Sequence, residues 1–405
     1  AAMGAKLLCL FLTSVLVAYY IYTPMPEDCE DPWKTMLMMA TFRIVGHLGT
    51  IAEQLGLMHY MDVQMLITSA DYVDPMSDEN VTVTDTEVNN VPVRLFVPRK
   101  ESDGLRRVVV FFHGGGWCLG NAGMKAYDHV TRWTSNRLNA VVISVNYRLA
   151  PKYHFPAQFE DVYSVTKFFL QSKVLSQYGA DPNRVCVAGD SAGGNLAAAV
   201  AQQLLEDPEV ETKLKAQALL YPALQTLDLN SPSYQENVND PILSKSLMVR
   251  FWSEYFTPDV SLREAMASNR HVPLESSHLF QFANWSSLLP EEMKKGHVYS
   301  SPTYGSPELA RRYPGFLDTR AAPLLATDAQ LLRLPATYIL TCQHDVLRDD
   351  GVMYARRLQA VGVPLTHHHA EDAFHGAMLF TSSPVALAVG QRLLKGYIQW
   401  LDENL

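Results

Sequence analysis

Residues 189–194 (GDSAGG) constrain the fold of this chain more than any other stretch. An apolar segment, residues 184–188, precedes them, and an alanine-rich run, residues 195–201, follows them. This order predicts a strand, a sharp turn and a helix, with Ser191 exposed on the turn at the carboxyl end of the strand. Glycines beside the serine avoid clashes between side chains and backbone in a strained turn. The motif predicts a nucleophilic serine, and a glycine-rich turn without chemistry is the alternative.

A second glycine-rich turn follows another predicted strand. Residues 108–112 form a continuous apolar run, which is typical of a strand buried on both faces, and residues 113–116 (HGGG) come directly after it. Amides in such a turn can approach a ligand oxygen closely because glycine has no side chain. We expect the imidazole at position 113 to shape this loop and not to act as a base. An oxyanion hole is therefore predicted from this loop and the residue after the serine, namely His113, Gly114, Gly115, Gly116 and Ala192.

An acid and a base follow two later strands. Asp345 comes after the apolar run 336–342, and His375 comes after a strand predicted from residue 363 onwards. The carboxyl ends of parallel strands share one edge of a sheet, and the order Ser191, Asp345, His375 is that of an α/β-hydrolase. In this hypothesis His375 takes the serine proton, while Asp345 orients the imidazole and stabilises its charged form.

Neighbouring polar residues offer competing assignments. Asp349 and Asp350 lie close to the predicted acid, but we expect them to cap the helix that follows them. His367, His368 and His369 resemble a metal cluster. Successive strand residues face opposite ways, however, so these three side chains cannot all point at one ion. We predict no metal and no cofactor.

Alternating strands and helices predict an α/β-hydrolase fold, with a mostly parallel eight-stranded sheet, helices on both faces and a helical cap. Residues 81–97 read as a β-hairpin around Asn89 and Asn90. The alternation stops between residues 225 and 320, where aromatic residues form either plain core or a lipophilic cap. The predicted domains are residues 1–23 as an N-terminal signal-anchor transmembrane helix, 24–80 as an N-terminal helical cap segment, 81–224 as hydrolase core, 225–320 as a cap insertion and 321–405 as the C-terminal part of the core.

The N-terminal region predicts a membrane anchor. Residues 7–22 are apolar and uncharged, and three tyrosines near their end suit a membrane interface. Lys6 precedes the segment, whereas Glu27, Asp28, Glu30 and Asp31 follow it, so the positive-inside rule places the rest of the chain in the lumen. A cleaved signal peptide would show small residues at a cleavage site, and none stand there. Two glycosylation sequons fit a lumenal body, at Asn80 and Asn284.

Two further features leave alternatives open, and the net charge excludes one class of partner. Residues 33–66 carry apolar side chains at helical spacing, which fits core packing or a lid over an apolar pocket. Cys118 follows the HGGG loop and Cys342 precedes the acid, so either a Cys118–Cys342 disulfide or two buried free thiols is expected at this edge. The formal net charge of −9 gives no basic footprint for nucleic acid.

The motifs carry a family resemblance. HGGGW at residues 113–117 and GDSAG at 189–193 resemble the hormone-sensitive-lipase group of α/β-hydrolases, and YRLAPKYHFP at 147–156 belongs to a likeness that runs nearly end to end. The resemblance implies a serine esterase and amidase that cleaves esters and arylacetamides of small lipophilic compounds, drugs included, through an acyl-enzyme. It also implies a part in lipid mobilisation, and the triad Ser191, Asp345 and His375.

The resemblance further implies a single-pass type II protein of the endoplasmic reticulum membrane with a lumenal catalytic domain. Glycans at Asn80 and Asn284 and the Cys118–Cys342 bridge follow from the same likeness. Two other functions remain open on this fold, a glyceride lipase proper and a non-catalytic ligand-binding protein on a hydrolase scaffold. The sequence makes no prediction of oligomeric state.

Overall fold

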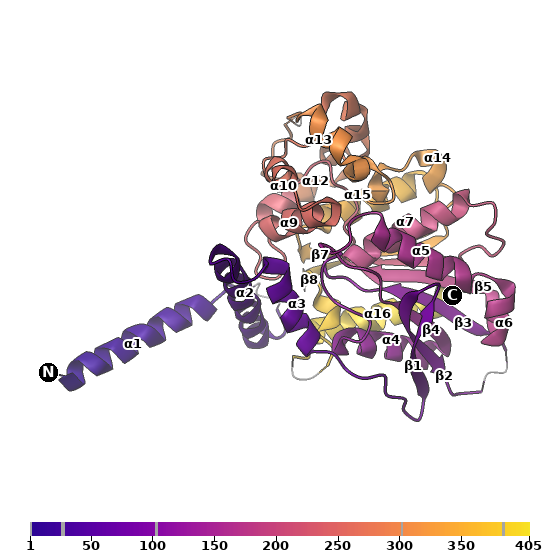
Figure 1. Cartoon of the computed structure of the whole chain (residues 1–405), viewed down its shortest axis with the longest axis horizontal. Helices are drawn as coiled ribbons and strands as arrows, with labels where there is room; N and C mark the ends of the chain where they lie inside the picture. Colours follow the sequence, from indigo (N-terminus) through magenta and orange to yellow (C-terminus); the bar gives the residue numbers. More distant parts are fainter. Residues whose placement is uncertain (1, 26–28, 102–103, 301–302, 383–384) are drawn as a thin grey trace.

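The computed structural model describes residues 2–25, 29–101, 104–300, 303–382 and 385–405. Two of the acidic residues expected after the apolar segment, Glu27 and Asp28, lie outside these ranges. Figure 1 shows a body built around one sheet, from which helix α1 (Ala2–Ile21) projects.

The central sheet has eight strands in the order β1-β2-β4-β3-β5-β6-β7-β8, which confirms the predicted sheet. Asn89 and Asn90 join the first two strands as an antiparallel hairpin, and both have positive φ, as a tight hairpin turn requires. β2 pairs with β4 antiparallel, and the remaining neighbours run parallel. The strands are β1 (Val81–Val88), β2 (Val91–Pro98), β3 (Arg106–Phe112), β4 (Ala140–Val145), β5 (Ala180–Asp190), β6 (Ala216–Leu220), β7 (Ala336–His344) and β8 (Leu365–Phe374).

Helices cover both faces of this sheet (Figure 1). Alternation along β3 sends Val108 and Val110 into one hydrophobic cluster and Val109 and Phe111 into another. The first cluster includes residues of α5 (Ala157–Phe169), α6 (Ser172–Gln177), α7 (Ala192–Glu206) and α15 (Arg348–Ala360); the second includes residues of α4 (Lys125–Leu138) and α16 (Ala388–Asn404).

Two segments distant in sequence meet beside the carboxyl edge of the sheet. One is the pair α2 (Pro32–Gln54) and α3 (Tyr60–Ala70), and the other is the chain between β6 and β7. Arg250 of α9 (Lys245–Phe256) donates from Nη1 to Glu53 of α2 at 2.9 Å, and its guanidinium lies 4.4 Å from the centre of the Tyr60 ring. The second segment contains α8 (Pro232–Glu236), α9 (Lys245–Phe256), α10 (Val260–Ala267), η1 (Leu274–Phe282), α11 (Trp285–Leu288), α12 (Glu291–Lys294), α13 (Pro307–Arg312), η2 (Pro314–Leu317), η3 (Pro323–Leu325) and α14 (Asp328–Leu331).

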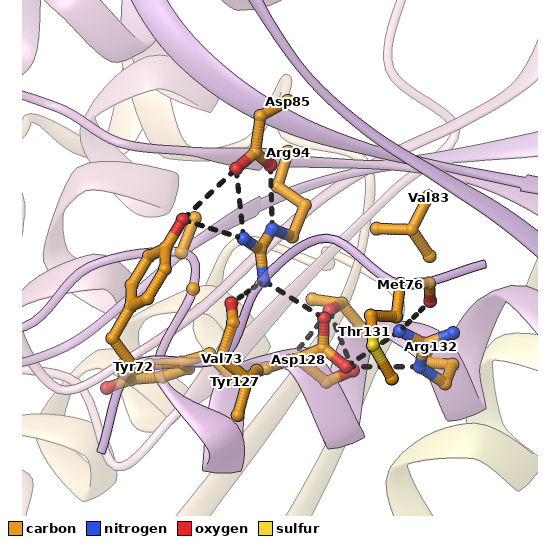
Figure 2. Close-up of polar contacts among 12 residues, drawn as sticks. Tyr72, Val73, Met76, Val83, Asp85, Arg94, Tyr127, Asp128, Thr131 and Arg132 are labelled. Carbon is orange, nitrogen blue, oxygen red and sulfur yellow. Dashed lines mark hydrogen bonds and ion pairs between the residues drawn. The ribbon is translucent and has the colours of Figure 1, made fainter. Parts of the chain in front are cut away.

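A buried arginine ties the hairpin to α4 (Figure 2). Arg94 of β2 is 2% exposed, and it donates to Asp85 at 2.7 Å and to Asp128 of α4 at 3.2 Å. Arg132, one turn further along α4, pairs with the other oxygen of Asp128 at 3.0 Å. The network fixes the helix that carries Tyr127 towards the HGGG loop. The remaining partners of Arg94 are Tyr72 and Val73.

The predicted disulfide between Cys118 and Cys342 is not formed, and both thiols are free and buried. Cys118 follows β3 and belongs to the first hydrophobic cluster, whereas Cys342 lies on β7 and belongs to the second. The two side chains therefore pack on opposite faces of the sheet, whereas a disulfide needs its two side chains to point towards each other. β5 and β6 also separate β3 from β7. A common position at one edge of the sheet is therefore not enough to predict a disulfide between Cys118 and Cys342.

Candidate active site

Ser191 stands on the predicted turn between β5 and α7. Its φ of 56° and ψ of −118° are unfavourable for a side-chain-bearing residue. A Cβ atom at Gly189 would lie 2.3 Å from the carbonyl oxygen of Gly193, and one at Gly193 would lie 2.0 Å from that of Phe112. The glycines of the motif are therefore a steric requirement of this turn.

The three residues predicted to act together are within hydrogen-bonding distance of one another. His375 Nδ1 donates to Asp345 Oδ2 at 2.8 Å, because a carboxylate can only accept. The neutral ring then accepts at Nε2, which lies 2.9 Å from Ser191 Oγ. The amide of Leu347 donates to the other Asp345 oxygen at 2.8 Å, which holds the carboxylate in place.

Electrostatics favour a proton on this imidazole. Burial alone would lower the pKa of His375, but the charge and hydrogen bond of Asp345, together with the charges of Asp190 and Asp240, raise the pKa above its ordinary value of 6.5. The edge of the Tyr221 ring packs against the imidazole at 5.1 Å between centroids. The site can therefore accept a proton from Ser191 and stabilise the resulting charge.

The HGGG loop presents backbone amides beside the serine. Gly115 and Gly116 have φ of 106° and 61°, and a Cβ atom at Gly115 would lie 2.3 Å from the Leu119 carbonyl oxygen. Both glycines line the same pocket as Ser191. Within the described part of the chain, the amides of Gly115, Gly116 and Ala192 have no recorded acceptor. These three amides are free to bind a substrate oxygen.

The other two residues predicted for the oxyanion hole have different contacts. The Gly114 amide donates to Asp190 and to the Tyr127 hydroxyl, both at 2.8 Å. The His113 ring donates to the Gly114 carbonyl at 2.8 Å and stacks on Tyr147 at 4.3 Å. Burial lowers the pKa of His113 to about 4, so the ring is neutral. These contacts fit the expected loop-shaping part for His113 and remove Gly114 from the candidate donors.

Asp190 and Tyr127 belong to the site without having been predicted from the sequence. Asp190 accepts from the Gly114 amide at 2.8 Å and from Tyr127 at 3.2 Å, so it joins the serine turn to the HGGG loop. Burial raises the pKa of this carboxyl to about 7. The position of Asp190 directly before the serine could have predicted this role, since a carboxyl group at the end of a buried strand needs hydrogen-bond donors.

The competing acids lie away from the serine. Asp349 and Asp350 lie within the first turn of α15, whose N-cap position is Leu347, so they do not cap the helix as expected. Asp349 accepts from the amide of Ser233 at 2.7 Å, and Asp350 accepts from that of Leu224 at 2.9 Å. Both are buried and hold the chain after β6 against α15.

The histidines of β8 alternate as expected. His367 and His369 both contact the Thr341 hydroxyl, at 2.8 and 2.9 Å, whereas His368 contacts the Tyr338 hydroxyl at 3.0 Å. They are therefore divided between the two faces of the sheet. No group of three potential metal ligands was found among the described residues.

A pocket of about 1040 Å³ opens above the serine. It is lined by Ser191 and His375 at its base, by α2 and α3 on one side, and by the chain from Asn239 to Leu247 on another. Apolar residues around it include Phe42, Ile242, Leu243, Leu247, Phe251, Leu379 and Phe380.

The two sequons differ in their surroundings. Asn80 is exposed at the start of β1. Asn284 is half-buried and caps α11, where its side-chain oxygen accepts from the amide of Ser286 at 3.1 Å and from the Ser286 hydroxyl at 2.7 Å.

A nucleophile turn, an imidazole and a carboxylate at the carboxyl edge of a mostly parallel sheet define a serine hydrolase with the α/β-hydrolase fold. The alpha/beta hydrolase fold family matches residues 109–284 and 304–379. The chain is 59% identical over 402 residues to arylacetamide deacetylase of Oryctolagus cuniculus, covering 99% of this chain and 100% of that protein. It is 47% identical over 404 residues to neutral cholesterol ester hydrolase 1 of Bos taurus, covering 98% and 99%.

A solved structure, an esterase of Pyrobaculum calidifontis, is 26% identical and matches with a TM-score of 0.60, covering 87% of this chain and 92% of that one. The chain belongs to the arylacetamide deacetylase family of α/β-hydrolases. It is an enzyme of the serine carboxylesterase and amidase class, and the family and fold expected from the HGGGW and GDSAG motifs are confirmed.

Proposed function

We propose that this protein hydrolyses esters and arylacetamides of small lipophilic compounds, drugs included, through an acyl-enzyme on Ser191. The observation that carries the proposal is the hydrogen-bonded series Ser191–His375–Asp345 at the base of an apolar pocket. The name of the rabbit relative supports the arylacetamide part.

The proposed roles follow from the contacts. Ser191 Oγ attacks the carbonyl carbon of the substrate while His375 Nε2 takes the hydroxyl proton. The resulting oxyanion lies against the amides of Gly115, Gly116 and Ala192, and each such donor is worth about 2.7–4 kcal/mol. His375 then returns the proton to the departing alcohol or amine, and a water molecule repeats the sequence to release the acid.

We propose that the segments 24–80 and 225–320 act as a cap on the core segments 81–224 and 321–405. The contact of Arg250 with Glu53 and Tyr60 joins the two cap segments beside the pocket. The cap makes the pocket apolar and so selects lipophilic substrates.

Acetyl esters and matched acetanilides test the reaction. The Ser191→Ala variant should keep its melting temperature and lose turnover of both, whereas the wild type should cleave both. Equal turnover by the variant and the wild type would refute the enzyme mechanism and favour the ligand-binding alternative. Esters cleaved without anilides would confine the proposal to esterase activity.

A glyceride or other neutral-lipid hydrolase is the second candidate, with a part in lipid mobilisation. The pocket of about 1040 Å³ is large for a short acyl group, since drug-sized ligands occupy pockets of roughly 300–1,000 Å³. The name of the Bos taurus relative favours the same function. Esters of increasing acyl length separate the candidates, because a lipase should prefer the longest chains.

We also propose that α1 anchors the protein in the endoplasmic reticulum membrane as a single-pass type II segment, with the catalytic domain in the lumen. Eight large apolar side chains of α1 are each at least 48% exposed, namely Leu7, Leu8, Leu10, Phe11, Leu12, Val15, Leu16 and Val17. By length and composition, α2 qualifies among the described residues as long enough to span a membrane, and Lys6–Ile21 is a shorter apolar helix.

Glycosidase treatment of microsomal protein tests the orientation. A lumenal body should lose mass on treatment, and the exposed Asn80 should carry the larger share of glycan. Asn80→Gln and Asn284→Gln variants assign each site. Native protein without any mass change would contradict the lumenal placement.

A further inference from the structure

Helix α2 presents an uncovered apolar face. Six large side chains along it are between 47% and 73% exposed, and they recur three, four or seven positions apart, so they form one stripe. At 1.5 Å per residue the stripe runs for about 33 Å. We call it the outer stripe of α2, and its members are Trp33, Leu37, Ile44, Leu48, Ile51 and Leu55.

The opposite face of α2 is packed against the body. Met38 and Met39 are each 6% exposed, and the Phe42 ring meets the Phe380 ring edge-on at 6.2 Å. A Cβ atom at Gly49 would lie 2.9 Å from the Tyr60 ring of α3, so the two helices are in close contact. Although α2 is long and apolar enough to cross a membrane, one face is occupied by protein, and the geometry suits a helix lying in a membrane surface.

The end of α1 is fastened to α2. Arg43 donates to the Tyr20 carbonyl at 2.6 Å and to the Thr23 hydroxyl at 3.0 Å. The Tyr20 hydroxyl also meets His47 at 2.9 Å. Figure 1 shows α2 running across the inner end of α1. A membrane spanned by α1 would therefore have α2 at its surface, where tyrosine and tryptophan side chains are favoured.

We propose that the outer stripe of α2 lies in the surface of the lipid bilayer. In this position the opening of the pocket is next to the membrane. The inner side of the same helix lines the pocket at Phe42, Gly46 and Thr50, so lipophilic esters dissolved in the bilayer reach the pocket beside a helix already in contact with lipid. The inference rests on the proposed anchoring by α1, because α1 supplies the continuity with the bilayer.

Site-specific probes test the lipid contact. Full-length protein carrying Cys9→Ser and Cys29→Ser receives one accessible cysteine, by Leu12→Cys in α1, Leu48→Cys in the outer stripe or Lys173→Cys on α6. Figure 1 places α6 on the far side of the body from α1. Each variant is labelled with a polarity-sensitive fluorophore and reconstituted into phosphatidylcholine vesicles that contain a lipid with a quencher on its acyl chain.

The probe at position 48 decides the inference, and the probe at position 12 decides the anchoring. Quenching at position 48 with none at position 173 supports contact of α2 with lipid. Quenching at position 12 with none at position 48 overturns the inference and leaves the anchor intact. Disulfide cross-linking between two copies at position 48, without quenching, overturns it in favour of a second copy on the stripe.

Enzyme assays test the consequence for substrate entry. The variant Ile44→Glu/Leu48→Glu/Ile51→Glu changes outer-stripe side chains that do not line the pocket. Its turnover of a long-chain ester dissolved in vesicles should fall by at least about fivefold, while turnover of a water-soluble acetyl ester stays unchanged. The matched control, Leu105→Glu/Val298→Glu/Leu332→Glu, alters side chains that are 54%, 88% and 55% exposed and should change neither rate. Equal loss on both substrates, or no loss, would overturn the inference.

Discussion

Two buried clusters of charged side chains in this molecule contain similar groups but differ in function. The cluster at Ser191 supports catalysis, and the cluster at Arg94 supports stability. At Ser191, the imidazole of His375 lines a pocket, and the carboxylate of Asp345, which is 1% exposed, accepts a hydrogen bond from that imidazole. At Arg94, a guanidinium that is 2% exposed is enclosed by Asp85, Asp128 and backbone. All three Arg94 nitrogens have acceptors, so nothing is left to react. Near Ser191 the amides of Gly115 and Gly116 have no acceptor among the residues that the structure describes. Reactivity thus comes from groups left without a protein partner, whereas stability comes from complete pairing.

The largest expected effect is on chemistry. Asp345→Asn should lower kcat for an acetyl ester by about 10⁴-fold, because the imidazole loses the partner that sets its tautomer and stabilises its charge. The fold should persist, since an asparagine oxygen can still accept from the Leu347 amide. Steady-state kinetics and a melting curve measure the two quantities. A loss below tenfold would contradict the proposed role of this acid.

Arg94→Met should lower stability and leave catalysis unchanged, which is the reverse of the effect expected for Asp345→Asn. Removing the guanidinium leaves one oxygen of the buried Asp128 without its donor, while Arg132 still pairs with the other oxygen. The loss of this contact and of the pair with Asp85 should lower the free energy of unfolding by about 3 kcal/mol. Urea denaturation measures this change, and activity per folded molecule should stay near that of the wild type. A loss under about 1 kcal/mol would show that this cluster contributes no more than a surface ion pair.

Asp190 shares features with both clusters, because it is buried and hydrogen-bonded like Asp128 but lies directly before the reactive serine. The Asp190→Asn variant tests its role. An asparagine keeps one acceptor but presents an NH2 group to Tyr127 or Gly114, so the HGGG loop loses one of its supports. We expect kcat to fall by roughly 10- to 100-fold, equivalent to about 1–3 kcal/mol for an unpaired buried group. Unchanged kcat together with unchanged stability would exclude Asp190 as a positioning residue.

The pH dependence follows from His375. Only the neutral imidazole can take the serine proton, so kcat/KM should fall tenfold per pH unit as pH drops below the pKa of His375. Asp345 raises that pKa above 6.5, so the midpoint of the acid limb should lie above 6.5 in the wild type and lower in Asp345→Asn. A profile of kcat/KM between pH 5 and 9 checks this, and a midpoint well below 6.5 would contradict it.

The smallest effect is expected at the rim of the Arg94 cluster. The Arg132 side chain is 23% exposed, and its partner Asp78 is 42% exposed. Because water screens the pair with Asp78, and Arg94 still pairs with Asp128 when Arg132 is replaced, Arg132→Gln should lower the free energy of unfolding by about 0.5–1 kcal/mol. Urea denaturation beside Arg94→Met gives the comparison, and equal losses would show that the two arginines act as one unit.

The fold and the site were predictable from the sequence to different degrees. Turn chemistry at Asn89 and Asn90, and steric demands at Gly189 and Gly193, are local, so short motifs report them. The meeting of Ser191, Asp345 and His375 was predictable because topology alone brings strand ends to one edge. The free state of the Cys118 thiol was not, because sharing an edge does not tell on which face of the sheet each side chain packs.

Side-chain pairing was also beyond the sequence. Arg94 and Asp128 carry no motif, and only the packing of α4 on the hairpin brings them together. The expected helix over residues 33–66 is two helices, α2 and α3, with a break between Leu55 and His59. Helical spacing predicted an apolar face, but only some of the apolar residues are buried: Met36 and Met39 are, whereas Ile44 and Leu48 are exposed. The spacing of apolar residues along a helix does not tell which of them will pack against another element.

The position of β8 has a consequence during biosynthesis. His375 follows this edge strand and is 184 residues away from Ser191 in sequence. A growing polypeptide therefore displays its serine turn long before the base that activates it has been synthesised. Hydrolysis has to await the arrival of the last strand, so a ribosome-bound or truncated chain that ends before that strand is inert towards esters.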